Sequence, residues 1–187
     1  MKPTLRIAIL SVAAAAAAST AGCGDLTGLD ASFRVFEDTV TVFALSGSPV
    51  TAPVAINTIQ GTAVRAEPTS GFDILFDITP EGQGEILPPA ALGLGGRAGV
   101  LVSTQDFDDI GRAADGGYEE NNPTLVNVGD VLVVRAASSA CAGLVNPFIY
   151  SKLEILDIDP DARTFRVRLR VDPNCGFRSF GEGVPDD

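Results

Sequence analysis

The sequence predicts an all-β domain, either an antiparallel β-sandwich or a partly open barrel with one short helix, behind an N-terminal signal peptide. From Phe33 onward, apolar residues recur mainly at every second position, and β-branched residues are abundant. Clusters of Gly, Pro, Asn and Asp interrupt this pattern at short intervals. Short strands separated by turns are typical of a sandwich or a barrel, so residues 32–187 are expected to form one β-rich domain.

Residues 1–22 have the features of a signal peptide. Lys2 and Arg6 precede an uncharged apolar run over residues 7–18. This run is shorter than the roughly 20 residues that a membrane-spanning helix needs. Small residues also fit ordinary signal-peptidase cleavage after Ala21. The chain beyond is therefore expected to be exported.

The segment Thr20-Ala21-Gly22-Cys23 resembles the lipobox of bacterial lipoproteins. The resemblance implies that the leader is removed before Cys23, that a lipid (palmitate included) on Cys23 anchors the chain to a membrane, and that residues 23–31 are a tether. Gly24 implies sorting to the outer membrane, facing the periplasm or the cell surface. Thr20 departs from the usual Leu, so cleavage after Ala21 stays open as the alternative.

Strands in the first half of the domain are expected between turn-forming residues. In the clearest of them, Phe72, Ile74, Phe76 and Ile78 alternate with other residues and give one apolar face. A turn over residues 80–83 should join this strand to the next one. The expected strands are residues 39–45, 54–59, 62–66, 72–78 and 84–87.

The second half is expected to begin with strand 100–104 and a helix over residues 106–114. That helix would have an acidic first turn, Arg112 near its end and two glycines to stop it. A strand at residues 131–136 and a long hairpin of residues 148–158 and 164–171 should follow.

The hairpin has a well-specified register. If its apolar faces match, Ile155 lies opposite Phe165 or Val167, and Glu154 then lies opposite an arginine. A slip of one residue would bury the arginines, so it is disfavoured. Tyr150, Lys152 and Glu154 are expected to point away from the core.

The chain has three cysteines, an odd number for an oxidising compartment. Lipidation of Cys23 would leave Cys141 and Cys175, which are expected to form a disulfide. A reactive thiol pair has little support, because neither cysteine lies in a C-x-x-C motif and the chain contains no His to lower a thiol pKa.

Composition excludes several function classes. The formal net charge is −11, and because Lys2 and Arg6 belong to the leader, the chain from Cys23 carries 11 basic and 24 acidic residues, or −13. General nucleic-acid binding is therefore disfavoured. The absence of His removes the commonest general base and a common metal ligand, and no motif predicts a cofactor.

The candidate binding surface is a strip of arginines on the last strand. Its members Arg166, Arg168 and Arg170 could dock an anionic partner such as lipopolysaccharide phosphate or an acidic protein. The plainer interpretation is a solvated strand face paired with Glu154. Flanking residues of the same charge are Arg163 and Arg178.

Two acidic groups are weak calcium candidates. Asp157, Asp159 and Asp161 alternate like the start of a calcium loop, but Ala162 and Arg168 stand where the loop needs Gly and Glu. An Asp-rich turn explains the same residues. The second group has no fixed spacing; it comprises Asp106, Asp108, Asp109, Asp115, Glu119 and Glu120.

Catalysis finds little support. Lys152 is the only lysine after the leader, and its neighbour Ser151 should lie on the opposite strand face, so the two cannot form a dyad. We therefore expect a non-catalytic binding or structural module on the cell envelope, with an envelope protein or a glycan as partner. The alternative is a secreted, glycosidase-like hydrolase with two facing carboxylates in a pocket.

Overall fold

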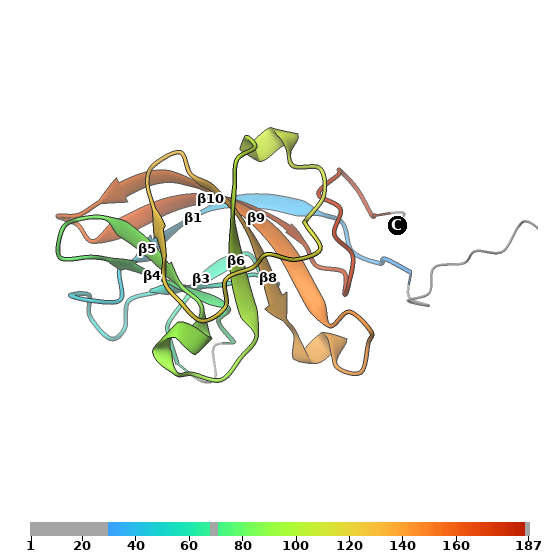
Figure 1. Cartoon of the computed structure of the whole chain (residues 1–187), viewed down its shortest axis with the longest axis horizontal. Helices are drawn as coiled ribbons and strands as arrows, with labels where there is room; N and C mark the ends of the chain where they lie inside the picture. The colour runs from blue at the N-terminus through green and yellow to red at the C-terminus, as the bar shows by residue number, and fades with distance from the viewer. Residues whose placement is uncertain (1–29, 68–70, 186–187) are drawn as a thin grey trace, which may run out of the picture.

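The computed structural model describes residues 30–67 and 71–185, which form two antiparallel five-stranded sheets packed as a sandwich (Figure 1). The predicted all-β class is confirmed. The predicted signal peptide, Cys23 and most of the tether lie outside the described residues. No helix within the described ranges is long and apolar enough to cross a membrane.

The first sheet has the strand order β1-β10-β9-β8-β6, and the second has the order β3-β2-β4-β5-β7. The first sheet consists of β1 (Phe36–Phe43), β6 (Ala98–Ser103), β8 (Val131–Ala137), β9 (Phe148–Asp159) and β10 (Thr164–Asp172). The second consists of β2 (Ala55–Asn57), β3 (Thr62–Val64), β4 (Ile74–Ile78), β5 (Gly84–Leu87) and β7 (Thr124–Val126).

The hairpin of β9 and β10 has the predicted register. Ile155 pairs with Val167, and Glu154 pairs with Arg168; a bulge between Arg166 and Val167 shifts the pairing beyond that point. The inward side chains of β10 meet the second sheet, where the rings of Phe165 and Phe76 lie 5.3 Å apart. Fully buried side chains from both sheets share this core; they include Ile56, Ile74, Ile86, Leu153, Ile155 and Leu169.

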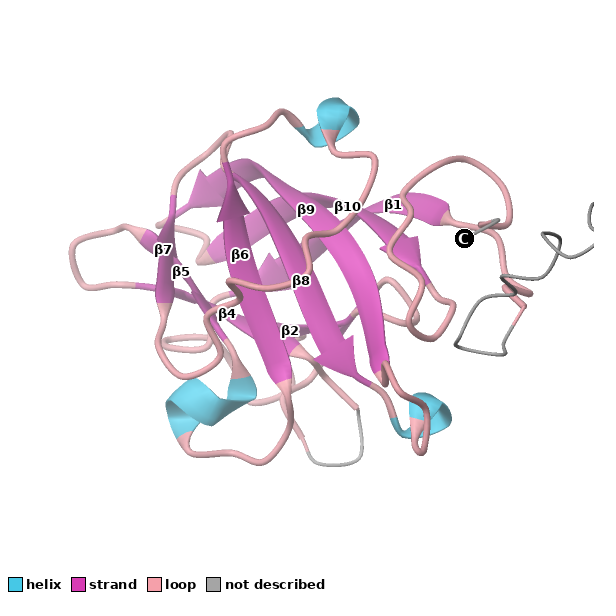
Figure 2. Ribbon diagram, turned by 45° about the vertical axis from the view of Figure 1, so that its right-hand side comes forward, coloured by secondary structure: helices cyan, strands magenta, loops and turns pink. Residues whose placement is uncertain are grey.

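A second apolar cluster covers the outer face of the first sheet. Figure 2 shows loops crossing this face in front of β8 and β9. Apolar side chains from these loops pack on outward-facing residues of the two strands, so this part of the sheet is buried on both sides. The cluster comprises Phe107, Ile110, Ala113, Val131, Val133, Tyr150 and Phe180.

The predicted helix over residues 106–114 is wrong, because the structure has only a 3-10 turn, η2 (Phe107–Asp109). The segment pairs with the C-terminal chain instead. Arg112 and Ser179 form an antiparallel bridge, the Ala113 amide donates to the Arg178 carbonyl at 2.8 Å, and the Phe180 amide donates to the Gly111 carbonyl at 2.8 Å. Sequence patterns of helix ends contain no information on such a distant partner.

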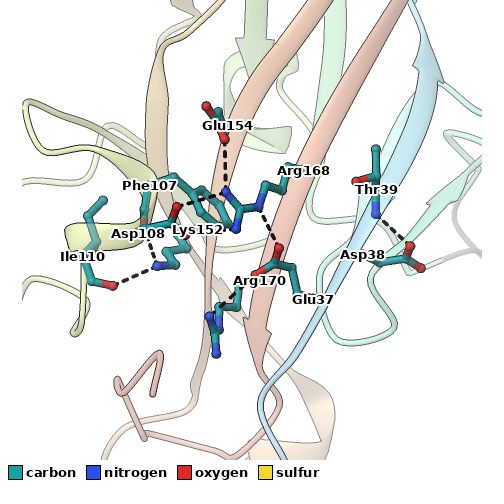
Figure 3. Close-up of polar contacts among 10 residues, drawn as sticks. All are labelled: Glu37, Asp38, Thr39, Phe107, Asp108, Ile110, Lys152, Glu154, Arg168 and Arg170. Carbon is teal, nitrogen blue, oxygen red and sulfur yellow. Dashed lines mark hydrogen bonds and ion pairs between the residues drawn. The ribbon is translucent and has the colours of Figure 1, made fainter. Parts of the chain in front are cut away.

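Lys152 lies in this outer layer, on the face of β9 opposite to buried Ser151. It is 1% exposed, and its Nζ donates to the carbonyl oxygens of Phe107 and Ile110, 3.0 Å away for Ile110 (Figure 3). The ammonium also lies 4.5 Å from the centre of the Phe107 ring. Burial, followed by the charge of Arg170, lowers the pKa of Lys152.

The predicted disulfide between Cys141 and Cys175 is confirmed, with Cα atoms 5.5 Å apart. Cys141 belongs to the 3-10 turn η3 (Ser139–Cys141), just after β8. Cys175 follows the end of β10. The bond therefore joins the turn between β8 and β9 to the C-terminal segment. Two further differences from the sequence expectation are the short 3-10 helix η1 (Pro89–Leu92) and β7, which no pattern predicted.

Replacing both Cys141 and Cys175 with Ala is expected to lower the melting temperature by roughly 10 °C. Opening a loop between cysteines 34 residues apart costs about 3 to 4 kcal/mol on the chain-entropy model, and each kcal/mol corresponds to about 2–4 °C for a domain of this size. Calorimetry with and without reductant tests this. Reductant should lower the melting temperature of the wild type and leave that of the double variant unchanged. A wild-type melting temperature that reductant does not change would contradict the prediction.

Replacing Lys152 with Met is expected to flatten the alkaline pH dependence of stability. The lowered folded-state pKa means that the unfolded chain binds more protons between that value and 10.5, so wild-type stability rises with pH in this window. Urea unfolding of both proteins from about pH 7 to about pH 10.5 measures the difference. Parallel profiles would show that the folded-state pKa of Lys152 is ordinary. Lys152→Ala, which also removes the buried stem, should cost about 3 kcal/mol at neutral pH.

Candidate functional site

The predicted arginine strip lies on the outer face of β10, where carboxylates surround its middle member. Arg168 Nε lies 2.7 Å from Glu37 Oε1, Nη2 lies 2.9 Å from Asp108 Oδ1, and Nη1 lies 3.6 Å from Glu154 Oε2 (Figure 3). The hydrogen bond to Glu37 is the main cause that raises the pKa of Arg168. Three carboxylates therefore neutralise this guanidinium.

The other two strip members differ from each other. Arg170 Nη1 lies 3.6 Å from Glu37 Oε2, and its side chain is largely buried. Arg166 is exposed, and among the described residues no carboxylate lies within ion-pair distance of it. The strip thus has the geometry of a paired strand face, as the plainer interpretation expects, and offers one unneutralised charge to a partner.

The first calcium candidates lie in and beside the β9–β10 turn. Asp159 Oδ1 accepts hydrogen bonds from the amides of Asp161 at 2.9 Å and Ala162 at 2.8 Å, which closes the turn. Arg163 follows with a left-handed φ of 55°. Asp157 is exposed and lies opposite Arg166 in the backbone register of the hairpin, without forming an ion pair. The turn therefore uses its Asp-rich sequence for backbone hydrogen bonds.

Members of the second acidic group are also engaged. Asp108 pairs with Arg168, Asp115 with Arg178, and Glu120 with Arg135. The amides of Asn121 and Asn122 donate to Glu119 and lower its pKa. In residues 30–67 and 71–185, no three His, Cys, Asp or Glu side chains lie close enough together to hold a metal ion.

The structure brings other arginines together in a cleft of about 420 Å³ at the edge of the outer layer. It is formed by the paired chain after η2, the outward faces of β8 and β9, the loop between η3 and β9, and the stretch that follows Cys175. The cleft combines guanidinium groups, aromatic rings and amide groups. We call this site the arginine cleft. Its lining comprises Arg112, Asp115, Arg135, Val145, Asn146, Phe148, Tyr150, Gly176, Phe177 and Arg178.

Arg135 forms one wall of the arginine cleft and is held by two rings and a carboxylate. Its guanidinium carbon lies 4.7 Å from the centre of the Tyr118 ring and 4.9 Å from that of Phe148. Its Nη2 donates to Glu120 at 2.7 Å. Its Nε is buried and has no hydrogen-bond partner among the described residues. Because the rings fix the guanidinium plane, this side chain is pre-organised to bind an anion.

Arg178 lies beside the bridge between Arg112 and Ser179, which brings the cationic side chains of both segments to one place. Arg178 forms an ion pair with Asp115, whose side chain is 93% exposed. Gly116 and Gly117 follow Asp115 directly. Displacing an exposed carboxylate that is followed by two glycines costs little free energy.

The remaining wall depends on Gly176 and Asn146. Gly176 has a φ of 81°, and a Cβ built on it would lie 3.1 Å from the Asn146 Cβ, so glycine fits best here. Asn146 Nδ2 donates to the Gly176 carbonyl at 3.2 Å and to the Tyr150 hydroxyl at 3.3 Å. An amide and a phenol therefore lie beside the arginines as further hydrogen-bonding groups.

Sequence reasoning found only one of the three cleft arginines, Arg178, and assigned it to the strip. The sequence predicts Arg112 at the end of a helix. Arg135 lies in a strand whose other residues are apolar, and no pattern singles it out. The outward direction predicted for Tyr150 is one signal of the cleft in the sequence. A single charged residue in an apolar strand, as at Arg135, could have indicated a functional position.

Two further clefts are lined mainly by small and apolar residues and contain no carboxylate among their described lining.

No protein-family model matches this chain, and no curated protein matches it at a significant level.

Proposed function

We propose that this protein is an exported, membrane-tethered binding module without catalytic activity, and that it holds an anionic ligand in the arginine cleft. One observation carries the proposal. On a chain with a net charge of −11, three guanidinium groups from separate segments converge on one cleft. A local reversal of charge in a concave site favours an anion there.

The arginines keep donors for a ligand after their internal pairing. A guanidinium has five N–H donors in one plane, and a carboxylate takes at most two of them. Arg135 donates to Glu120 through Nη2, and its Nη1 makes no hydrogen bond among the described residues. Arg178 pairs with the exposed Asp115. We infer that the ligand's anionic group displaces Asp115 and binds Arg178 in its place.

The lining supports binding rather than hydrolysis. A glycosidase needs two carboxyl groups roughly 5 to 10 Å apart across its substrate. Asp115 is the one carboxylate among the described residues that line the three clefts, and it is ion-paired. The arrangement gives no support to the hydrolase alternative.

Attachment to the envelope is the part of the proposal that rests on the sequence. The leader and the lipobox-like segment support export and a lipid on Cys23. The disulfide between Cys141 and Cys175 fits an oxidising compartment. Lipidation would keep the domain close to the membrane, in reach of envelope molecules that carry phosphate or carboxylate groups.

Variants of the arginine cleft test ligand binding directly. Arg135→Gln and Arg178→Gln are each expected to weaken binding of inorganic phosphate roughly tenfold, because each loses a charge-assisted contact. Asp115→Asn should strengthen it about two- to fivefold, because a competing carboxylate is removed. Isothermal titration of each purified protein measures the affinities.

The matched control is Arg166→Gln, which removes the same charge from an exposed site outside the cleft. It should change the affinity by less than about twofold, since its charge is screened. Equal losses for Arg166→Gln and Arg178→Gln would show that only net charge matters. Absence of anion binding by the wild type would refute the proposed site.

The tether is tested by Cys23→Ala. This variant is expected to move from the membrane fraction to the soluble fraction of lysed cells, because a lipid-modified cysteine would be its membrane attachment. Fractionation followed by immunoblotting measures the distribution, with Cys141→Ala as the control for loss of a different cysteine. A Cys23→Ala protein that stays in the membrane fraction would refute lipidation as the anchor.

A further inference from the structure

We propose that the ligand of the arginine cleft is the phosphate of an anionic lipid headgroup in the membrane that carries the tether, so that the cleft end of the domain faces the bilayer. This inference rests on the proposed function, both on the cleft as an anion site and on the lipid at Cys23. It adds the class of ligand and the orientation of the domain.

The N-terminal segment enters the domain beside the cleft. Asn174 Oδ1 accepts hydrogen bonds from the amides of Ser32 at 2.8 Å and Phe33 at 2.9 Å, and its Nδ2 donates to the Phe33 carbonyl at 2.8 Å. Buried Asp172 holds Asn174 in place through its Oδ1. Gly176, two residues beyond Asn174, lines the arginine cleft. Figure 1 shows the start of the described chain, in blue, and the C-terminal segment, in red, at the same end of the molecule.

The reach of the tether keeps this end near the membrane. Six residues lie between Cys23 and Asp30, the first described residue, so the chain takes seven Cα-to-Cα steps between them. A chain of that length spans at most about 25 Å when fully extended. A lipid on Cys23 would therefore hold the entry point, and the cleft beside it, within about the thickness of one domain from the headgroups. The effective concentration of headgroups at the cleft would be high.

Apolar side chains are exposed at this same end. Val145, which lines the cleft, is 90% exposed, and Phe33 at the entry point is 63% exposed. Val184, next to the residue that bridges Val35, is also exposed. Scattered apolar residues on a surface need no explanation by themselves, but apolar groups beside cations are the combination that binds the headgroup–acyl boundary.

Charge favours a single orientation toward an anionic membrane. From Cys23 onward the net charge is −13, so most faces of the domain are repelled by anionic lipid. The strip around Arg168 offers little attraction, because three carboxylates neutralise that residue. In the cleft, Arg135 has Glu120 as its ion-pair partner, and Arg178 has only Asp115, which is almost fully exposed. The cleft end is therefore the face that can approach the membrane.

Phosphate fits the donors better than other membrane groups. Guanidinium forks bind phosphate oxygens in pairs, and the planes of two rings fix the orientation of Arg135. Arg97 adds a further cation nearby, because its guanidinium carbon lies 5.3 Å from the centre of the Phe148 ring. Glycerol hydroxyls of a headgroup would find the Asn146 amide and the Tyr150 hydroxyl as partners.

The test uses the full chain with Cys23→Ala, so that no lipid anchor contributes to binding. Flotation with vesicles of phosphatidylglycerol and phosphatidylcholine is compared with flotation with phosphatidylcholine alone, at about 0.1 M salt. We expect flotation with the anionic vesicles only. Adding Arg178→Gln or Arg135→Gln should reduce the bound fraction roughly tenfold, while Arg166→Gln changes it less than twofold. Circular dichroism checks that each variant is folded, and Arg178→Lys, which keeps the charge and loses the fork, should give an intermediate loss.

A parallel titration with inorganic phosphate and glycerol 3-phosphate separates this inference from the proposed function. Binding of these soluble anions without binding of anionic vesicles would overturn the lipid headgroup and leave the anion site standing. Binding of neither probe would overturn both. Equal flotation of Arg178→Gln and Arg166→Gln would overturn the cleft as the membrane-facing site.

Discussion

The pairing of β9 with β10 decides which side chains of these two strands face the core and which face outward. With Ile155 opposite Val167, the apolar side chains of both strands meet the second sheet, and Tyr150, Lys152 and Arg168 face outward. A slip of one residue would bury the arginines of β10 and expose Phe165, whose ring contacts Phe76, so the alternative register costs free energy. The outward residues then form the floor on which the loops pack. The arginine cleft lies at the edge of that floor, and its position follows from the register.

The loops that build the cleft have little regular structure, so other interactions must hold them. Lys152 on β9 donates hydrogen bonds to the carbonyl groups of Phe107 and Ile110 in the loop that packs over it. The bridge between Arg112 and Ser179 joins this loop to the C-terminal segment. On the opposite wall the disulfide holds Cys175 one residue before Gly176. A binding site on irregular segments needs such fixed points, because donors that move lose affinity when a ligand orders them. The buried lysine is thus best understood as a structural group that supports the site without touching a ligand.

The sequence predicted local features better than distant ones. Alternation of apolar residues identified most strands, and the facing patterns of the hairpin identified its register, because both signals lie within short stretches of chain. The helix over residues 106–114 was wrong because a partner more than sixty residues away, the chain around Ser179, competes for its backbone hydrogen bonds. The cleft could not be predicted for the same reason. Arg112, Arg135 and Arg178 come from three segments with no common motif, and only the fold brings them together.

The two groups of arginines show why clustering in the sequence is a poor guide to a binding surface. The strip is dense along β10, yet Glu37, Asp108 and Glu154 all lie within 4 Å of Arg168, so its charge is satisfied by the protein itself. In the cleft, Arg135 has one carboxylate, and Arg178 has a carboxylate that is almost fully exposed. What favours a ligand is the number of donors left after internal pairing, together with a concave shape that limits screening by solvent. By that criterion we propose the sparse group as the binding site, whereas the carboxylates around Arg168 make the dense group a paired strand face.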